Sequence, residues 1–257
     1  MRVTSGDGVR IAFEVMGTGP PLVLLHGFFG DRTTWRSAGH VDALAGDHRL
    51  VLVDARGHGG SDSPHDVDSY RIDRQVRDVV AVLDALDISR AAFWGASMGG
   101  IIGLNLLAEH PERLTALIAG GAHGGHVAAA PAEIQQEVEL FRTRGMAPFI
   151  EMLELQGPLP AWMREAMQAA DPHALAALTA ALDDRDGVLE RLVRTPVPVL
   201  LLAGDRDPRL RSIRDTAARV RGATCVELSG CGHLDTFLRL DLTLPVVRPF
   251  LAEYAAG

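Results

Sequence analysis

Short, mostly apolar runs recur along the chain and alternate with segments of helical periodicity. Such runs are typical of strands that are buried on both faces, as in a parallel sheet between two layers of helices. They occupy residues 22–25, 50–53, 91–94, 114–119, 197–203 and 224–228. The alternation therefore predicts an α/β protein whose mostly parallel sheet is covered by helices on both faces.

Segments beside these runs complete the predicted core. Residues 9–16 alternate between apolar and polar after a turn-forming Gly-Asp-Gly, so we expect the chain to open with an antiparallel hairpin. Apolar residues at helical spacing predict helices over 72–86 and 98–109. The final segment, 236–254, is predicted to be a helix that its two internal prolines kink or interrupt.

Residues 123–195 break this rhythm, because they contain helical patterns rich in Ala, Leu, Met and Glu but no convincing strand. The strand pattern of the core resumes at Val197. We therefore interpret 123–195 as a helical cap inserted into one core, which is formed by residues 1–122 and 196–257. A separately folding C-terminal domain fits less well, since core strands are predicted on both sides of the insertion.

The composition narrows the class of partners. With 47% apolar residues, the 257-residue chain can bury a large core, and its formal net charge of −8 disfavours a nucleic-acid-binding surface. No apolar run approaches the ~20 residues of a membrane helix, and the N-terminus lacks the apolar stretch of a signal peptide. Two cysteines, Cys225 and Cys231, are too few for a disulfide framework. We expect a cytoplasmic protein without nucleic-acid or membrane partners, and its oligomeric state stays open.

The segment Gly95-Ala96-Ser97-Met98-Gly99 lies where an apolar run gives way to a helical pattern. Gly-x-Ser-x-Gly in this setting is typical of a nucleophilic serine on a sharp strand-to-helix turn. The two glycines leave room where a Cβ would collide with the neighbouring strand or helix. The positive end of the following helix favours negative charge that develops near the serine. We interpret Ser97 as a nucleophile; a glycine-rich turn with an incidental serine is the alternative.

A serine hydroxyl needs an adjacent base to become an effective nucleophile, and His233 is the best candidate. It ends a small-residue loop, 229–233, that follows the last predicted core strand. Glycines in this loop allow it to fold over the strand ends and bring the imidazole to Ser97. Two other histidines, His26 and His58, are interpreted as residues that shape loops.

The acid that orients the base is expected after another core strand, where Asp205 and Asp207 compete. Asp207 lies farther out, where its loop can reach a histidine, so we assign it to hold the imidazole tautomer and stabilise the imidazolium. Asp205 is interpreted as a brace of the turn.

Acyl transfer also needs two donors for the developing oxyanion. The backbone N–H groups of Met98 and Phe28 are predicted to supply them, from the turn after the nucleophile and the loop after residue 25. Phe29, His123 and Trp162 are predicted to line the substrate pocket. His123 and His126 are three residues apart, but no third ligand that could complete a metal site is evident, so neither a metal nor another cofactor is expected.

These motifs resemble those of the α/β-hydrolase superfamily over essentially the full length of the chain. The matching features are His-Gly at 26–27, Asp-x-Arg-Gly-His-Gly-x-Ser-Asp at 54–62, the turn around Ser97, and the order serine, acid, histidine along the chain. Within the superfamily the chain is similar to small bacterial serine esterases, enol-lactonases and cofactor-free haloperoxidase- or perhydrolase-like members. The resemblance implies an eight-stranded sheet, antiparallel at its second strand, with the cap at 123–195.

Two departures from the superfamily's patterns bear on the activity. Enol-lactonases of the oxoadipate pathway often lack the His-Gly pair that this chain carries at 26–27. Epoxide hydrolases and haloalkane dehalogenases have an aspartate where this chain has Ser97, which excludes those activities.

The leading functional hypothesis is hydrolysis of a small carboxylic ester or lactone through an acyl-Ser97 intermediate. A second hypothesis uses the same three residues to cleave a carbon–carbon bond or to transfer the acyl group to an acceptor other than water. A third is a non-catalytic ligand receptor that keeps the fold without turnover. Such a receptor is expected to lack a residue of the catalytic triad or of the oxyanion loop, and this chain has a candidate for each of them.

Overall fold

An eight-stranded sheet with the order β1-β2-β4-β3-β5-β6-β7-β8 forms the centre of the computed structural model, which describes residues 1–126, 130–155, 157–182 and 186–255. β2 runs antiparallel to β1 and β4, and all neighbours from β4 to β8 are parallel. The strands are β1 (Arg2–Thr4), β2 (Arg10–Met16), β3 (Pro21–Leu25), β4 (Arg49–Val53), β5 (Ala91–Ala96), β6 (Leu114–Gly120), β7 (Val199–Gly204) and β8 (Ala223–Leu228). The predicted sheet, with its opening hairpin, is confirmed.

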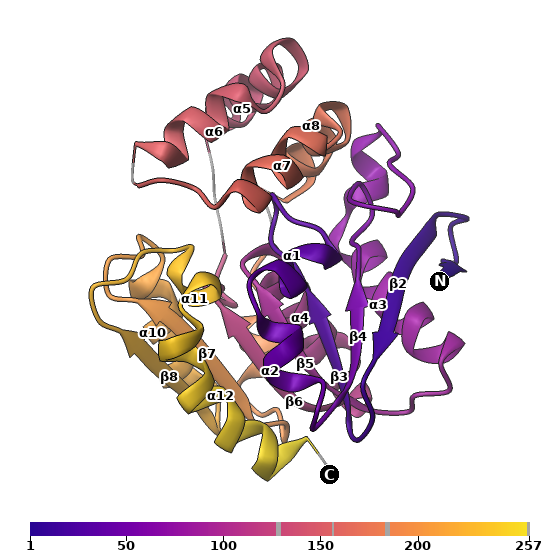
Figure 1. Ribbon diagram of the computed structural model, residues 1–257, viewed down its shortest axis with the longest axis vertical. Coiled ribbons are helices and arrows are strands. Elements are labelled where there is room, and N and C mark those ends of the chain that lie inside the picture. Colours follow the sequence, from indigo (N-terminus) through magenta and orange to yellow (C-terminus); the bar gives the residue numbers. More distant parts are fainter. Residues whose placement is uncertain (127–129, 156, 183–185, 256–257) are drawn as a thin grey trace.

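Helices cover both faces of this sheet, as predicted (Figure 1). One face carries α3, α4 and α10, and the other carries α1, α2 and α12. These helices, with the short α11, are α1 (Arg32–Ser37), α2 (His40–Leu44), α3 (Ile72–Ala85), α4 (Met98–Glu109), α10 (Leu210–Arg219), α11 (Asp235–Leu238) and α12 (Leu240–Tyr254). Two 3₁₀ turns, η1 (Val67–Tyr70) and η2 (Pro111–Arg113), complete the core. No helix in the described part of the chain combines the length and apolarity needed to cross a membrane.

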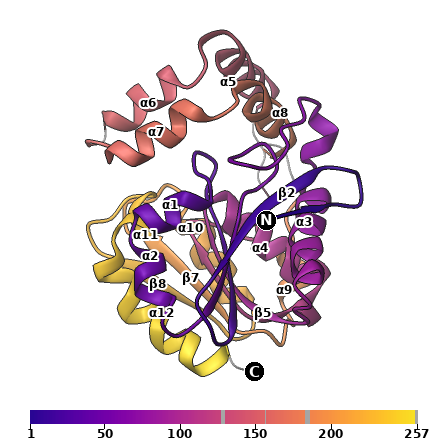
Figure 2. The same ribbon diagram turned by 45° about the vertical axis from the view of Figure 1, so that its right-hand side comes forward.

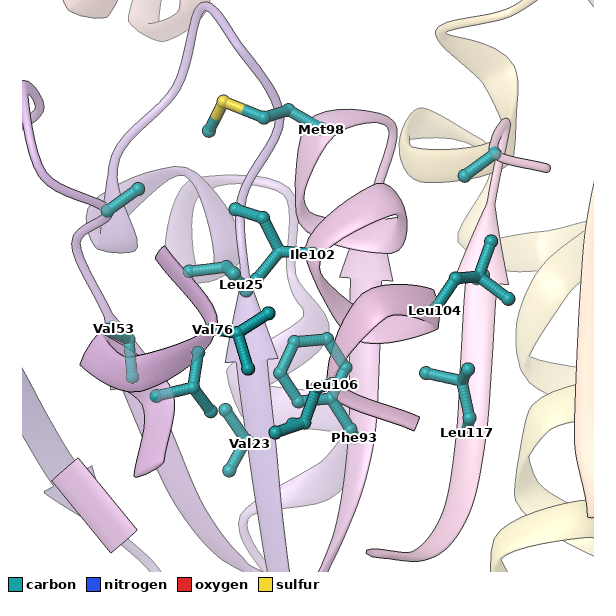
Figure 3. Close-up of a cluster of buried hydrophobic side chains, with 14 of the residues drawn as sticks. Val23, Leu25, Val53, Val76, Phe93, Met98, Ile102, Leu104, Leu106 and Leu117 are labelled. Atoms are coloured by element: carbon teal, nitrogen blue, oxygen red, sulfur yellow. The ribbon is translucent and has the colours of Figure 1, made fainter. Parts of the chain in front are cut away.

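Successive residues of each strand point to opposite faces, so the sheet separates two hydrophobic cores. Val23 belongs to one core, and its neighbour Leu24 to the other. Figure 3 shows the first core, in which Val76 of α3 and Ile102 of α4 cover side chains such as Phe93 of β5. Burial on both faces explains why the central strands β3 and β5 are apolar along their length.

The C-terminal helix differs from its prediction. α12 contains Pro245 and Pro249 and runs without interruption to Tyr254, so a break at the prolines is wrong, whereas a kink there stays a prediction. Both prolines lie on the exposed face, where carbonyl groups that lose an N–H partner can bond to water. The break in this segment lies at Arg239, between α11 and α12, where φ is −93° and ψ is 69°.

The regular secondary structure that the structure describes within the predicted cap segment consists of helices, joined by irregular segments. Its helices are α5 (Pro131–Arg144), α6 (Ala147–Glu154), α7 (Ala161–Ala169), α8 (Pro172–Leu182) and α9 (Leu189–Leu192). α5 to α8 lie together at one end of the molecule, above the sheet (Figures 1 and 2). α9 returns to the core beside α4, and the N–H groups of Val188 and Leu189 donate to the Gly124 carbonyl at 2.8 and 2.9 Å. The chain thus enters and leaves this segment at neighbouring points.

Candidate active site

Ser97 lies at the junction of β5 and α4 with φ 49° and ψ −108°, a conformation that non-glycine residues rarely adopt. Its N–H donates to the Gly120 carbonyl at 2.7 Å, which ties the turn to β6. A Cβ on Gly95 would lie 2.2 Å from the Gly99 carbonyl carbon, and one on Gly99 would lie 2.2 Å from the Leu25 carbonyl oxygen. Both glycines are therefore needed for the sharp turn that holds the serine at the end of the strand.

The loop that contains Asp205 and Asp207 follows β7, and the loop that contains His233 follows β8. Asp205 accepts hydrogen bonds from the N–H groups of Gly230 and Cys231, at 2.9 and 3.2 Å. The Asp205 carboxylate thus braces the histidine loop, in agreement with its interpretation as a structural residue. Asp207 points instead toward the imidazole of His233.

Three side chains from these loops meet in series. The Ser97 hydroxyl oxygen lies 2.8 Å from His233 Nε2, and His233 Nδ1 lies 2.7 Å from Asp207 Oδ2. The Asp207 side chain is fully buried, whereas 22% of the His233 side chain is exposed. The structure thus brings together the three residues that were predicted as nucleophile, base and acid.

The Asp207 carboxyl is ionised in this arrangement. Burial disfavours its charge, but its hydrogen bond to His233, together with nearby positive charge, holds its pKa below the ordinary value. Its second oxygen, Oδ1, accepts the backbone N–H of Arg209 at 2.9 Å. An ionised carboxylate only accepts hydrogen bonds, so His233 Nδ1 donates and Nε2 is left to accept from Ser97.

The predicted oxyanion donors flank the serine. Met98 is the first residue of α4, so its N–H has no acceptor within that helix. Gly27 is next to Ser97, because a Cβ on Gly27 would lie 3.5 Å from the Ser97 Cβ. Phe28 follows Gly27, and both residues line the same cavity as Ser97 and Met98.

His26 and His58 contact the backbone of the loop that contains Gly27 and Phe28. His26 Nε2 accepts the Ala55 N–H at 3.1 Å, so its Nδ1 carries the proton and donates to the Gly27 carbonyl at 2.8 Å. His58 Nε2 lies 2.8 Å from the Phe28 carbonyl oxygen. Burial, reinforced by the neighbouring His26, lowers the pKa of His58 to about 4, so its ring is neutral near pH 7.

A buried ion pair that sequence reasoning missed anchors the 54–62 loop. Arg56 is fully buried and donates to both carboxylate oxygens of Asp78 on α3, at 2.7 Å each, and to Asp7 at 2.8 Å. These carboxylates raise the pKa of Arg56 despite its burial. An arginine three residues after the end of a buried strand was the signal, since a buried guanidinium requires carboxylate partners.

A cavity of about 1120 Å³ opens above Ser97 and extends beneath the predicted cap. Phe29, one of the predicted pocket residues, is among its lining residues, whereas His123 and Trp162 are not. The Trp162 ring instead packs 6.4 Å from that of Phe237, which does line the cavity. Side chains from the predicted cap also form the wall: Leu140, Phe149, Leu153, Leu159 and Met163.

The fold has counterparts among known proteins. A model of the alpha/beta hydrolase fold family matches residues 20–170, which is more than half of the chain. The chain therefore belongs to the α/β-hydrolase fold family.

Individual relatives cover nearly the whole chain. The solved enol-lactonase of Burkholderia xenovorans LB400 is 25% identical, with a TM-score of 0.87, over 98% of this chain and 100% of that one. The solved esterase RhEst1 of Rhodococcus sp. ECU1013 is 27% identical, with a TM-score of 0.80, over 99% and 98%. A protein of Bacillus subtilis (strain 168), provisionally named a 2-succinyl-6-hydroxy-2,4-cyclohexadiene-1-carboxylate synthase, is 26% identical over 98% of both chains. An enol-lactonase is thus among the relatives although this chain carries His-Gly at 26–27.

Proposed function

We propose that the protein is a serine hydrolase that cleaves a small carboxylic ester or lactone through an acyl-Ser97 intermediate. The observation that supports this most directly is the pair of short contacts, 2.8 and 2.7 Å, that joins Ser97, His233 and Asp207 in series. This order of hydroxyl, imidazole and carboxylate is the arrangement that activates a serine for acyl transfer. An enol-lactonase and an esterase among its full-length relatives support an ester or lactone as the substrate.

In the first half-reaction, the Ser97 oxygen attacks the carbonyl carbon while its proton passes to His233 Nε2. The carbonyl oxygen becomes an oxyanion, which the N–H groups of Met98 and Phe28 stabilise by hydrogen bonds, each worth about 3 kcal/mol. The bond to the alcohol oxygen then breaks, and His233 returns the proton to that oxygen. The alcohol leaves, and the acyl group stays on Ser97.

In the second half-reaction, His233 takes a proton from water, and the resulting hydroxide attacks the acyl-serine. The same two N–H groups stabilise the second oxyanion. The bond between the acyl carbon and the Ser97 oxygen then breaks, His233 returns the proton to Ser97, and the carboxylic acid leaves. Asp207 stabilises the imidazolium in both halves without becoming protonated. No step requires a cofactor.

We propose further that residues 123–195 act as a cap that shapes the acyl- and alcohol-binding space. Support comes from the cavity wall, to which α5, α6 and α7 contribute apolar side chains opposite Ser97. Two aromatic contacts connect this segment with the core loop after β3: the Phe28 and Phe141 rings at 5.9 Å, and the Phe29 and Phe149 rings at 6.0 Å.

The test is turnover of 4-nitrophenyl butyrate by the wild type, Ser97→Ala and a matched control, Ser89→Ala. Ser89 is exposed and distant in the fold from the cavity, so its variant should keep wild-type kcat within about twofold. Ser97→Ala should lose at least about 10³-fold in kcat. Because one full-length relative is named a synthase, the products are identified by chromatography, and free butyrate must equal the nitrophenol released. Full activity of Ser97→Ala, or failure of a fluorophosphonate to label Ser97, would contradict the proposal.

A further inference from the structure

Arg209 lies against the imidazole that the proposed mechanism uses as its base. Its Nη1 atom is 3.2 Å from His233 Nδ1 and 3.3 Å from His233 Nε2. Within the ring plane these nitrogens already face Asp207 and Ser97. An in-plane approach equidistant from both nitrogens would collide with Cε1, which lies between them, so the guanidinium nitrogen lies over the ring face.

The carboxylates near Arg209 have other partners. Asp205 accepts the N–H groups of the 229–233 loop, and Asp235 accepts the Gly232 N–H at 2.6 Å. Asp207 attracts the guanidinium at longer range, but its oxygens bond to His233 and to the Arg209 backbone. Within the described residues, no carboxylate lies within ion-pair distance of the Arg209 side chain. Arg209 is exposed and lines the cavity that contains Ser97.

This placement has an energetic consequence for the proposed reaction. When His233 takes the serine proton, an imidazolium forms beside a guanidinium, and the two positive charges repel. With a neutral substrate, Arg209 therefore opposes the charge that Asp207 stabilises. A substrate anion bound to the guanidinium would offset this repulsion in the transition state, so it would raise kcat as well as lower KM.

The position of Arg209 also indicates which part of the substrate holds such an anion. His233 Nε2 must lie within hydrogen-bond reach of the departing alcohol oxygen in order to protonate it. Arg209 Nη1 is 3.3 Å from that same nitrogen, so a group one to three bonds from the alcohol oxygen can reach the guanidinium. Guanidinium groups bind carboxylates through two parallel hydrogen bonds. Arg206, which also lines the cavity, adds positive charge to this side.

We propose that Arg209 binds a carboxylate on the alcohol portion of the substrate, so that the enzyme is selective for acyl esters of short hydroxy acids. The inference rests on the proposed serine hydrolase function. Hydrolysis then releases the acyl group as a carboxylic acid and the alcohol portion as a free hydroxy acid, with one water consumed.

The experiment compares two isosteric esters, butyryloxyacetate and butyryloxyacetamide, which differ only in the charge of the alcohol portion. We expect the wild-type kcat/KM to be about 10- to 100-fold higher for butyryloxyacetate than for butyryloxyacetamide, after each value is divided by the rate of non-enzymatic base-catalysed hydrolysis of that ester. This ratio corresponds to the free energy of one charge-assisted hydrogen bond. Arg209→Gln should abolish this preference, and Arg209→Lys should keep part of it. Arg211→Gln changes an exposed arginine two residues away, in α10, that does not line the cavity, so this variant should keep the full preference.

Two further comparisons distinguish binding of a carboxylate on the alcohol portion from binding of one on the acyl portion and from a role of Arg209 in positioning His233. Monomethyl succinate and methyl succinamate place the same charge difference on the acyl side, and a preference confined to this pair would overturn the assignment. Equal losses on both glycolate-type esters in Arg209→Gln would also overturn it, because they indicate that Arg209 only positions His233. Wild-type turnover of 4-nitrophenyl butyrate without any preference for the carboxylate overturns this inference alone. Absence of that turnover removes the serine hydrolase function, and the inference with it.

Discussion

Replacing Asp207 by asparagine tests the proposed series of contacts with a nearly isosteric change. The side chain is fully buried, with Oδ2 facing His233 Nδ1 and Oδ1 accepting the Arg209 backbone N–H. If the asparagine oxygen keeps the Arg209 N–H, its NH₂ group must face His233 Nδ1. That nitrogen can then only accept, so the imidazole proton moves to Nε2, which no longer accepts the proton of Ser97.

The opposite amide orientation is also unfavourable, because it directs the NH₂ group at the Arg209 N–H and leaves a buried donor without an acceptor. We therefore expect the wrong tautomer to dominate. The predicted loss is about 10⁴-fold in kcat, or about 5 kcal/mol of transition-state stabilisation, with little change in KM. The assay is steady-state hydrolysis of 4-nitrophenyl butyrate, with thermal unfolding to verify that the variant folds.

Asp205→Asn provides the matched control, since it makes the same chemical change two residues away. Asp205 accepts the backbone N–H groups of Gly230 and Cys231 in the histidine loop and also bonds to the Ser229 side chain, so its amide can keep at least one of these contacts. We expect a loss in kcat of less than about tenfold, as for one neutral hydrogen bond. The reasoning is refuted if Asp207→Asn retains a tenth of wild-type kcat, or if Asp205→Asn is the more damaging change.

Three other predictions concern the turn, the buried histidine and the pH profile. Gly99→Ala should lower the free energy of unfolding by about 1–3 kcal/mol in urea titrations, because its Cβ would lie 2.2 Å from the Leu25 carbonyl oxygen. The control, Gly6→Ala, should have a free energy of unfolding near that of the wild type, because a Cβ there would have no heavy atom within 4 Å. Burial lowers the pKa of His40 to about 3, whereas its pKa in the unfolded chain is ~6.5. Below pH ~6.5 the unfolded state therefore binds a proton that the folded state does not, and the free energy of unfolding decreases by about 1.4 kcal/mol for each unit by which the pH is lowered. His40→Phe should therefore flatten acid destabilisation between pH 6 and 4; an unchanged slope would exclude His40 as its source. Finally, an imidazole must be unprotonated to accept the Ser97 proton, so kcat/KM should rise with pH, and a rate that falls as pH rises in folded protein would contradict the base assignment.

Local patterns account for what could be predicted before the fold was known. A strand buried on both faces must be apolar at each position, so runs such as 22–25 and 91–94 indicated β3 and β5 directly. The turn at Ser97 was predictable because steric contact acts within a few residues there, and glycine is required on both sides. His233 was predictable because glycines in a short loop after the last strand leave few other roles for it.

The amino-acid sequence by itself determined the strands, the serine turn and the candidate base, because each depends on residues that are neighbours along the chain. The position in the loop favoured Asp207 over Asp205, but only the tertiary structure shows which carboxylate meets an imidazole 26 residues away. It also decided that α12 continues through its prolines, because their exposed face lets water replace the missing bonds. The spacing of residues along the chain does not predict that Arg209 lies over the His233 imidazole, because this contact forms where the loops after two strands fold against each other.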